Sequence, residues 1–186
     1  KPTEPAISEE FEAMPTNRHA TVTTPLEDEL SLVSMHGREE LGQLFIYELT
    51  LVSENFDIEA NDLLCKSVTV HLETVGKEKR HFNGVVSHFS YAGAHGRYAA
   101  YRMTLRPWLW LLTHTVLNRV FQDTNIPDLV RRLFREYGFT DVEPSKLTGT
   151  YDKRKFVVQY RESVFHFVTR WLEHEGIYYY FKHEDG

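Results

Sequence analysis

The sequence predicts a mainly β fold with helical insertions (α+β), and three observations support that class. From His19 to Leu105, apolar and polar residues alternate with a period of two, which is typical of half-buried strands. After Pro107 the apolar spacing changes to that of helices. The 186 residues, of which 41% are hydrophobic and 13% aromatic, are enough to form packed cores. We therefore expect a globular chain with a β first part and a mixed second part.

The expected strands of the first part are rich in β-branched and aromatic residues. The clearest of them cover residues 44–51, 68–72, 80–91 and 98–105. The tripeptides His36-Gly37-Arg38 and Ala94-His95-Gly96 resemble turns. Gly84 lies inside a long predicted strand, where a glycine suggests a bulge that bends the strand, as the closing of a barrel requires. A curved, antiparallel sheet follows from this pattern.

Three helical segments are expected after Pro107. The first is short and covers residues 107–112, because proline suits the first turn of a helix. The second covers residues 125–137, with Asn125 as its N-cap and Gly138 as its C-terminal stop. The third lies between the cap residue Ser163 and Gly176 and has an apolar side. Strand-like segments at 156–160 and 177–181 flank this third helix, which predicts a β-α-β unit.

The chain is expected to have four segments. Residues 1–18 form a flexible N-terminal extension, 19–106 a first β-barrel domain, 107–140 a helical insertion or connector, and 141–186 the start of a second β-barrel domain. The last predicted strand leads into a turn at Lys182–Gly186 with no return strand. Folded proteins avoid such unpaired edges, so we expect the second barrel to be truncated.

Composition and the distribution of apolar residues limit the partners and structural features that this chain can have. The net charge of −6 arises from 27 acidic and 21 basic residues without a basic block, so no nucleic acid is expected. Cys65 is the only cysteine, which excludes an intramolecular disulfide. The longest apolar run, residues 108–112, is too short to span a membrane. Residues 1–17 lack the pattern of a secretory signal, so we expect that any export uses another route.

Catalytic signatures are weak throughout the sequence. The densest histidine cluster, His166, His174, Glu175 and His183, lacks the His-Glu-x-x-His spacing of helical zinc proteases. A metal- or carboxylate-dependent hydrolase that uses His166, His174 and His183 remains an alternative. Cys65 lies in an apolar stretch and is expected to be buried and unreactive. We therefore expect no catalytic, cofactor-binding or metal-binding residues.

Polar and aromatic residues of the second half are expected to serve structure or assembly. Gln122 and Gln159 can brace the backbone or lie at a subunit contact. The pairs Arg161–Glu162 and Arg170–Glu173 are expected either in solvent or at an interface. Trp108 and Trp171 are expected in cores, Trp110 near an interface, and the aromatic run 178–181 in core and interface packing.

Several motifs of this sequence resemble one family. These are Val157-Val158-Gln159-Tyr160-Arg161-Glu162-Ser163, then Phe165-x-Phe167-Val168-x-Arg170, and Glu173-x-Glu175-Gly176-Ile177-Tyr178-Tyr179-Tyr180-Phe181-x-His183. Upstream, in the same order, stand Gly37-Arg38-Glu39-Glu40-Leu41-Gly42, Phe82-Asn83-Gly84-Val85-Val86, Leu105-Arg106-Pro107-Trp108-Leu109-Trp110-Leu111-Leu112 and Arg119-Val120-Phe121-Gln122. From about residue 19 to the end, the chain resembles VgrG, the spike protein of bacterial type VI secretion systems.

The resemblance implies a structural role and a set of partners. It implies small antiparallel β-barrels of the phage tail hub type, a homotrimer, and docking on a hexameric secretion tube protein and on baseplate proteins. It also implies a C-terminal needle and effectors in longer members, no cofactor, and assembly in the bacterial cytoplasm. Delivery would follow without a signal peptide, into the extracellular space or a target cell. A baseplate hub of a phage or phage-like contractile tail is the alternative. Cys65 departs from the family, which usually has glycine at this position.

Overall fold

The computed structural model describes residues 19–74, 78–144 and 146–184, and divides them into two compact units. Unit 1 contains the described residues of Lys1–Glu40, Leu44–Trp108 and Phe181–Gly186. Unit 2 contains Leu41–Gln43 and the described residues of Leu109–Tyr180. The predicted extension at residues 1–18 lies outside the described residues.

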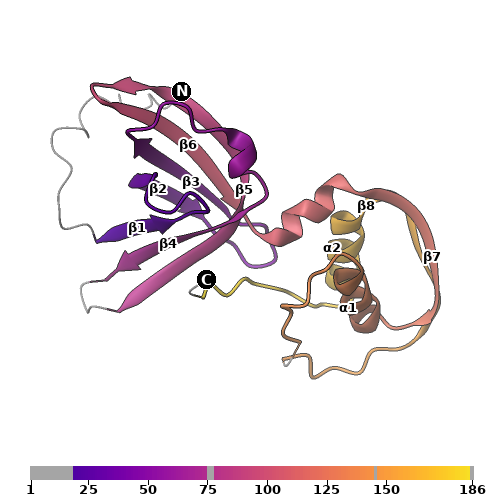
Figure 1. The fold of residues 1–186 in the computed structure, drawn as a ribbon. Coiled ribbons are helices and arrows are strands. Elements are labelled where there is room, and N and C mark those ends of the chain that lie inside the picture. Colours follow the sequence, from indigo (N-terminus) through magenta and orange to yellow (C-terminus); the bar gives the residue numbers. More distant parts are fainter. Residues whose placement is uncertain (1–18, 75–77, 145, 185–186) are drawn as a thin grey trace, which may run out of the picture. The chain divides into compact units, whose positions relative to one another are not determined.

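Unit 1 is built on one antiparallel sheet of six strands (Figure 1). These are β1 (Ala20–Thr23), β2 (Ser31–Arg38), β3 (Ile46–Ser53), β4 (Ser67–Glu73), β5 (Lys79–His95) and β6 (Tyr98–Arg106), in the order β1-β4-β5-β6-β3-β2. A short 3-10 helix, η2 (Ala60–Asp62), precedes β4. The sheet is curled, and β1 and β2, the strands at its two ends, do not pair with each other. The mainly β class and the curled antiparallel sheet are confirmed.

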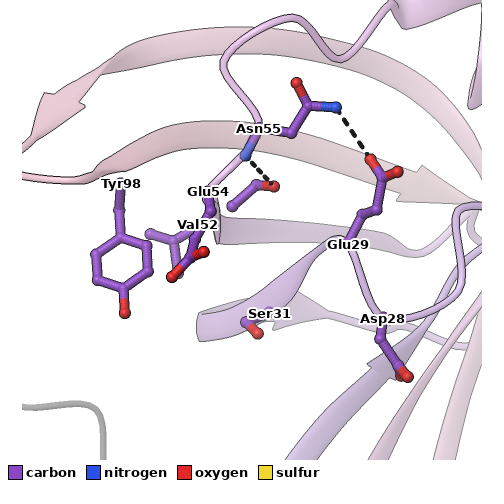
Figure 2. Close-up of a pocket in the computed structure, with 8 residues that line it drawn as sticks. Asp28, Glu29, Ser31, Val52, Glu54, Asn55 and Tyr98 are labelled. Atoms are coloured by element: carbon purple, nitrogen blue, oxygen red, sulfur yellow. Dashed lines mark hydrogen bonds between the residues drawn. The ribbon is translucent and has the colours of Figure 1, made fainter.

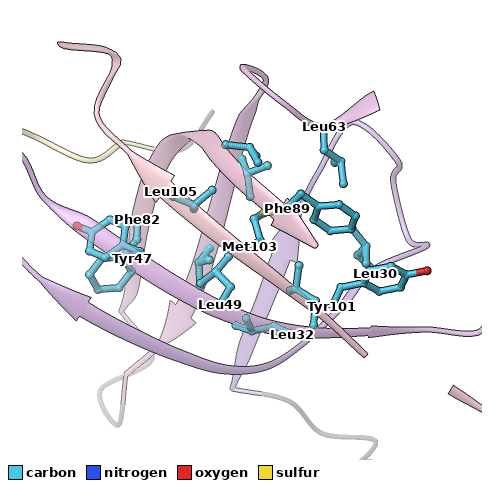
Figure 3. Close-up of a cluster of buried hydrophobic side chains, with 14 of the residues drawn as sticks. Leu30, Leu32, Tyr47, Leu49, Leu63, Phe82, Phe89, Tyr101, Met103 and Leu105 are labelled. Carbon is cyan, nitrogen blue, oxygen red and sulfur yellow. The ribbon is translucent and has the colours of Figure 1, made fainter. Parts of the chain in front are cut away.

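The core of unit 1 lies inside the curl of this sheet (Figure 3). Alternate residues of β3 point inward, so Tyr47, Leu49 and Leu51 are buried. They meet inward residues of the neighbouring strand β6, such as Met103 and Leu105. Full burial of one such side chain contributes about 1.5–3 kcal/mol. The period of two in the sequence therefore marks the inner face of the sheet.

Two glycines of unit 1 serve close packing and not the turn or the bulge predicted for them. Gly37 lies within β2, opposite Tyr47, and a Cβ there would come within 2.7 Å of the Tyr47 ring. Gly84 pairs regularly with Val68, and a Cβ there would lie 3.1 Å from the carbonyl oxygen of Arg106. The irregularities of β5 fall elsewhere, between Val86 and His88 and between Tyr91 and Gly93. Its end at His95 is followed by Gly96, whose φ of +59° is a turn conformation.

Unit 2 combines a two-stranded ribbon with two helices (Figure 1). The 3-10 helix η3 (Trp108–His114) leads into β7 (Val116–Thr124), α1 (Ile126–Glu136), β8 (Arg154–Ser163) and α2 (Val164–His174). Asn125 caps α1 by accepting a hydrogen bond from the Asp128 N–H at 2.9 Å. Ser163 caps α2 in the same way, with the His166 N–H at 3.1 Å. The predicted helices and their caps are confirmed, and none of the helices in the described part of the chain has the length and apolarity needed to span a bilayer.

The predicted β-α-β unit is not formed. Residues 177–184 have no strand conformation, because no neighbouring strand pairs with them in the described part of the chain. Instead, the Gly42 N–H donates to the Tyr179 carbonyl oxygen at 2.9 Å within unit 2. Strand β8 pairs with β7, so the predicted segments 107–140 and 141–186 contribute to the same unit. That residues 141–186 open a second barrel stays a prediction.

Two further expectations about burial are wrong. Trp108 and Trp171 are only half-buried, because Leu109 and Leu112 of η3 and Phe167, Val168 and Leu172 of α2 take the inner positions of their helices. Cys65 is exposed and not buried. Its φ of +59° turns the chain just before β4, and Leu63, two residues earlier, fills the core instead.

Candidate assembly surface

The ribbon of β7 and β8 has an unusual distribution of apolar side chains. The strands pair antiparallel, with Val120 opposite Val158 and Gln122 opposite Phe156. Their register shifts between Leu117 and Arg119, where the Asn118 side chain accepts a hydrogen bond from the Arg161 N–H at 2.8 Å. Because side chains alternate along both strands, the ribbon has two distinct faces.

The inner face of the ribbon is buried within unit 2. Phe121 is 4% exposed and Val157 is fully buried. The Phe121 ring stacks on Phe167 of α2, with the ring centroids 5.7 Å apart. The helix α2 therefore covers this face, and its apolar side, predicted from the sequence, is what the ribbon packs against.

The outer face of the ribbon is apolar and exposed. Val120 is 60% exposed, Phe156 54%, Val158 47% and Tyr160 63%. We call these four residues the ribbon face. A two-stranded ribbon is marginal by itself, and a contiguous apolar face in solvent marks a site of interaction with another protein surface.

Cationic side chains border the ribbon face. The guanidinium of Arg161 lies 5.2 Å from the ring centroid of Tyr160, and the ammonium of Lys155 lies 5.8 Å from that of Phe156. Both cations sit beside exposed rings, in the geometry of weak cation–π contacts. An apolar centre with charged residues at its border is the usual composition of a protein–protein interface.

The sequence-predicted polar residues near the ribbon have different roles. Gln159 is 1% exposed, and its amide donates to the Glu162 carbonyl oxygen at 3.1 Å, which is a bracing contact. Gln122 is exposed on β7. Arg170 pairs with Glu162 at 2.6 Å and not with Glu173 as predicted, because Glu162 stands at the end of β8 close to the start of α2.

The histidines proposed for a hydrolase are distributed over helix α2 and the C-terminal segment. His166 and His174 lie at opposite ends of α2, and His183 belongs to unit 1. His174 approaches Glu175 at 3.9 Å, but Arg154 already pairs with Glu175 at 2.7 Å. Among the described residues, no group of three or more His, Cys, Asp or Glu side chains could hold a metal ion. Cys65 is exposed, and its backbone N–H donates to the Val86 carbonyl oxygen at 2.9 Å.

His183 instead anchors the C-terminal segment to unit 1, a role that its sequence context did not predict. Its Nδ1 accepts a hydrogen bond from the Asn83 N–H at 3.1 Å. The proton of the neutral ring therefore lies on Nε2, which donates to Tyr47 Oη at 3.0 Å. Tyr47 Oη in turn donates to the Glu39 carboxylate. His183 and Phe181 both pack against the Phe45 ring, at centroid distances of 5.0 and 5.2 Å.

Burial governs the ionisation of this network. It lowers the pKa of His183, and the Glu39 carboxylate opposes that shift while Arg80 adds to it. Burial, and then the hydrogen bond to Glu39, raise the pKa of Tyr47. A proton on His183 Nδ1 would face the Asn83 N–H, so only the neutral ring fits this arrangement. The network is thus a neutral-pH anchor.

A shallow concavity in unit 1 is lined by acidic and polar side chains (Figure 2). Asp28, Glu29 and Glu54 contribute carboxylates, and the Asn55 amide donates to Glu29 at 3.2 Å. Arg97 lies 3.7 Å from Glu54 and offsets part of this charge. This surface is polar and open, in contrast to the ribbon face.

The curled sheet, the capped helices and the ribbon define a structural module of hub type. The chain belongs to the phage tail baseplate hub (GPD) family, whose family model matches residues 38–186.

Relatives of this chain are type VI secretion system spike proteins, in agreement with the resemblance of the sequence motifs. The chain is 47% identical over 170 residues to the type VI secretion system spike protein VgrG1b of Pseudomonas aeruginosa. The aligned region covers 91% of this chain and 23% of the relative. It is 46% identical over 172 residues to VgrG1a of the same organism, covering 92% of this chain and 27% of the relative. The resemblance to VgrG is confirmed, and the chain spans about a quarter of the length of these relatives.

A solved structure shows the same fold. The c3393 protein of E. coli matches with a TM-score of 0.64 and 24% identity, covering 77% of this chain and 42% of that chain. It is described as a type VI secretion system component with structural similarity to the bacteriophage T4 tail proteins gp27 and gp5. This likeness supports the hub-type fold.

Proposed function

We propose that this chain is a structural hub module of a type VI secretion spike. In this function it assembles as a homotrimer, docks on the hexameric secretion tube and baseplate proteins, and is driven with the spike into a target cell to deliver effectors. It acts by shape and by contact and not by catalysis. The proposal rests on the family membership and on the identity of 47% to a spike protein.

The ribbon face is the observation that carries the assembly part of the proposal. Its four apolar residues lie together on one exposed face of a two-stranded ribbon. The ribbon is covered on one side only, so a partner that packs on its other side would remove this apolar area from water. We assign that partner as a second copy of the chain, since a closed ring of identical subunits gives every copy the same cover.

A charge on the ribbon face tests this assignment. Val158→Glu places a carboxylate at the centre of the face without disturbing the buried core. The measurement is sedimentation of a polypeptide that has the full length of these spike-protein relatives. We expect the parent to sediment as a trimer and Val158→Glu to sediment as a monomer. A parent that sediments only as a monomer would contradict the trimer, and a trimeric Val158→Glu would contradict the role of this face.

Leu41→Glu is the matched control. Leu41 is also an exposed apolar residue of unit 2, at 63%, but it lies outside the ribbon. Its substitution adds the same charge and should leave the trimer intact. If both variants dissociate, the added charge and not the ribbon face is responsible.

A hub of a phage or phage-like contractile tail is the second candidate, because the family model is that of phage tail baseplate hubs. Secretion separates the two. In a bacterium with a type VI apparatus, we expect assembly in the cytoplasm and appearance of the protein outside the cell without a signal peptide. This export should cease when the sheath of the apparatus is inactivated, whereas a phage hub would be released only with tail particles.

A further inference from the structure

Two histidines face each other on neighbouring strands of unit 1. His71 of β4 and His81 of β5 are directly opposite in the antiparallel register. Their Nδ1 atoms are 2.9 Å apart, and the rings are nearly perpendicular, at 85°. Both side chains lie on the outer face of the sheet, since Val70 and Phe82, their neighbours in sequence, are buried in the core.

The His71 ring is oriented from its other side. Thr23 of β1 pairs with Thr69, which precedes His71 by two residues on β4 and therefore lies on the same face of the sheet. The Thr23 Oγ1 lies 2.9 Å from His71 Nε2. If Nε2 carries the proton and donates to this hydroxyl, the lone pair of His71 is on Nδ1, toward His81. An oxygen acceptor behind the outer nitrogen is the arrangement that orients a histidine for metal binding.

We propose that His71 and His81 form a two-point chelate for a divalent transition metal of the copper or nickel class. Imidazole nitrogens lie about 2.0–2.1 Å from such ions. Two nitrogens at that distance and 2.9 Å apart subtend about 90° at the ion. This is the angle between neighbouring ligands in square-planar or octahedral coordination, which copper(II) and nickel(II) favour, and it is too small for tetrahedral zinc.

Solvent molecules would complete the coordination of an ion bound by the two histidines. No third His, Cys, Asp or Glu side chain in the described part of the chain completes a metal-binding group. The neighbouring pair on the same face, Thr69 and Asn83, is joined by its own hydrogen bond of 2.8 Å. The site is thus an open surface chelate, and a bound ion would fasten β4 to β5 through their side chains.

Titration of the 186-residue chain, freed of any affinity tag, with nickel chloride tests the site. We expect one nickel ion per chain by calorimetry, and an apparent Kd at least about tenfold weaker in His71→Ala and in His81→Ala, because the second ligand acts intramolecularly. Thr23→Val, which keeps the shape but removes the hydroxyl, should weaken binding by about tenfold. His88→Ala, an exposed histidine of the same strand β5, should leave the Kd unchanged.

Spectroscopy of the unaltered chain provides a test that does not depend on the folding of variants. Pulsed electron paramagnetic resonance of the chain with one equivalent of copper(II) should show two imidazole nitrogens bound to the ion. A signal from one imidazole, or nickel binding that His71→Ala and His81→Ala leave as strong as His88→Ala does, overturns the proposal. The His–His contact would then be a simple hydrogen bond.

Discussion

Cys65 shows how a single residue can oppose the backbone around it. Its φ of +59° lies in the left-handed region, which a side chain with a Cβ disfavours by about 1–2 kcal/mol. The conformation is held because the Cys65 N–H donates to the Val86 carbonyl oxygen at 2.9 Å and Val86 N–H bonds back to Lys66 at 3.0 Å. The glycine that the resemblance to VgrG implies at this position would therefore have a conformational reason.

We predict that Cys65→Gly stabilises unit 1. The substitution removes the strain of the left-handed conformation, and part of that gain is offset by the greater freedom of glycine in the unfolded chain. The expected net increase in the free energy of unfolding is about 1 kcal/mol. Chemical denaturation measures it, and Cys65→Ala, which keeps a Cβ, should show no increase. An equal gain in both variants would assign the effect to loss of the thiol.

His183, also a single residue, makes the stability of the folded chain depend on pH. Its pKa is lowered in the folded chain by burial, so the unfolded chain binds the proton at a higher pH. The contribution of the anchor is therefore complete above the ordinary pKa of histidine, about 6.5, and is lost as the pH falls below it toward the folded pKa. Glu39 and Arg80 are the charged groups that act on this ring.

Hydrogen exchange at the Asn83 amide measures this prediction, because that N–H bonds to His183. Its protection factor, corrected for intrinsic exchange, should fall between about pH 7.5 and about pH 5. In His183→Gln, which has no titratable ring, the protection should be low at both values. Constant protection in the parent chain would contradict the anchor.

At the scale of elements, the two faces of the ribbon separate stability from assembly. Phe121 is buried against Phe167, so Phe121→Ala should destabilise unit 2 by about 3–5 kcal/mol. Phe156 is 54% exposed on the ribbon face, so Phe156→Ala should change unfolding little and weaken self-association. Thermal unfolding and sedimentation of the two variants check this opposite pattern. Equal destabilisation by both would mean that the ribbon face is covered within the monomer.

Elements with local signals could be predicted from the sequence. Helices α1 and α2 begin at Asn125 and Ser163, whose side chains accept the hydrogen bonds expected of caps. Residues 177–181 have the composition of a strand, but a strand exists only where another pairs with it. The local sequence predicts a turn at Gly37 and a bulge at Gly84, whereas their packing against Tyr47 and Arg106 depends on the strand register, which is not a local property.

The candidate surface was predictable only in part. The motif around Gln159 located β8, and burial of that glutamine agrees with a bracing role. Phe156, Val158 and Tyr160 on one face and Val157 on the other are all apolar, so the sequence does not reveal which face is covered. The bond between Asn83 and His183 joins residues 100 positions apart, and no local pattern reports it.

At the scale of the whole molecule, unit 1 is built from segments that are not consecutive in the sequence. Unit 1 includes Phe181 and His183, which follow all of unit 2 in the sequence. We predict that a chain ending at Tyr180 has a lower melting temperature for unit 1, because it lacks the packing of Phe181 and His183 on Phe45. Unit 2 should be unaffected, since the hydrogen bond of Lys146 to Tyr180 Oη at 2.9 Å is retained.

Calorimetry, or fluorescence with a probe in each unit, measures the two transitions. The chain with Phe181→Ala and His183→Ala is the matched control for truncation, because it keeps the backbone and should lower the unit 1 transition to a similar extent. A shift of the unit 2 transition alone would contradict the assignment of this segment.

The return of the chain to unit 1 also fixes an order of events during synthesis. The ribosome releases the strands of unit 1 first, yet the imidazole that accepts the Asn83 N–H emerges only after residues 109–180 have been made. Nascent unit 1 therefore lacks the cover of Phe45 and the acceptor of the Asn83 N–H while unit 2 is translated. His183 acts as a late closing step, which couples completion of the first unit to translation of the second.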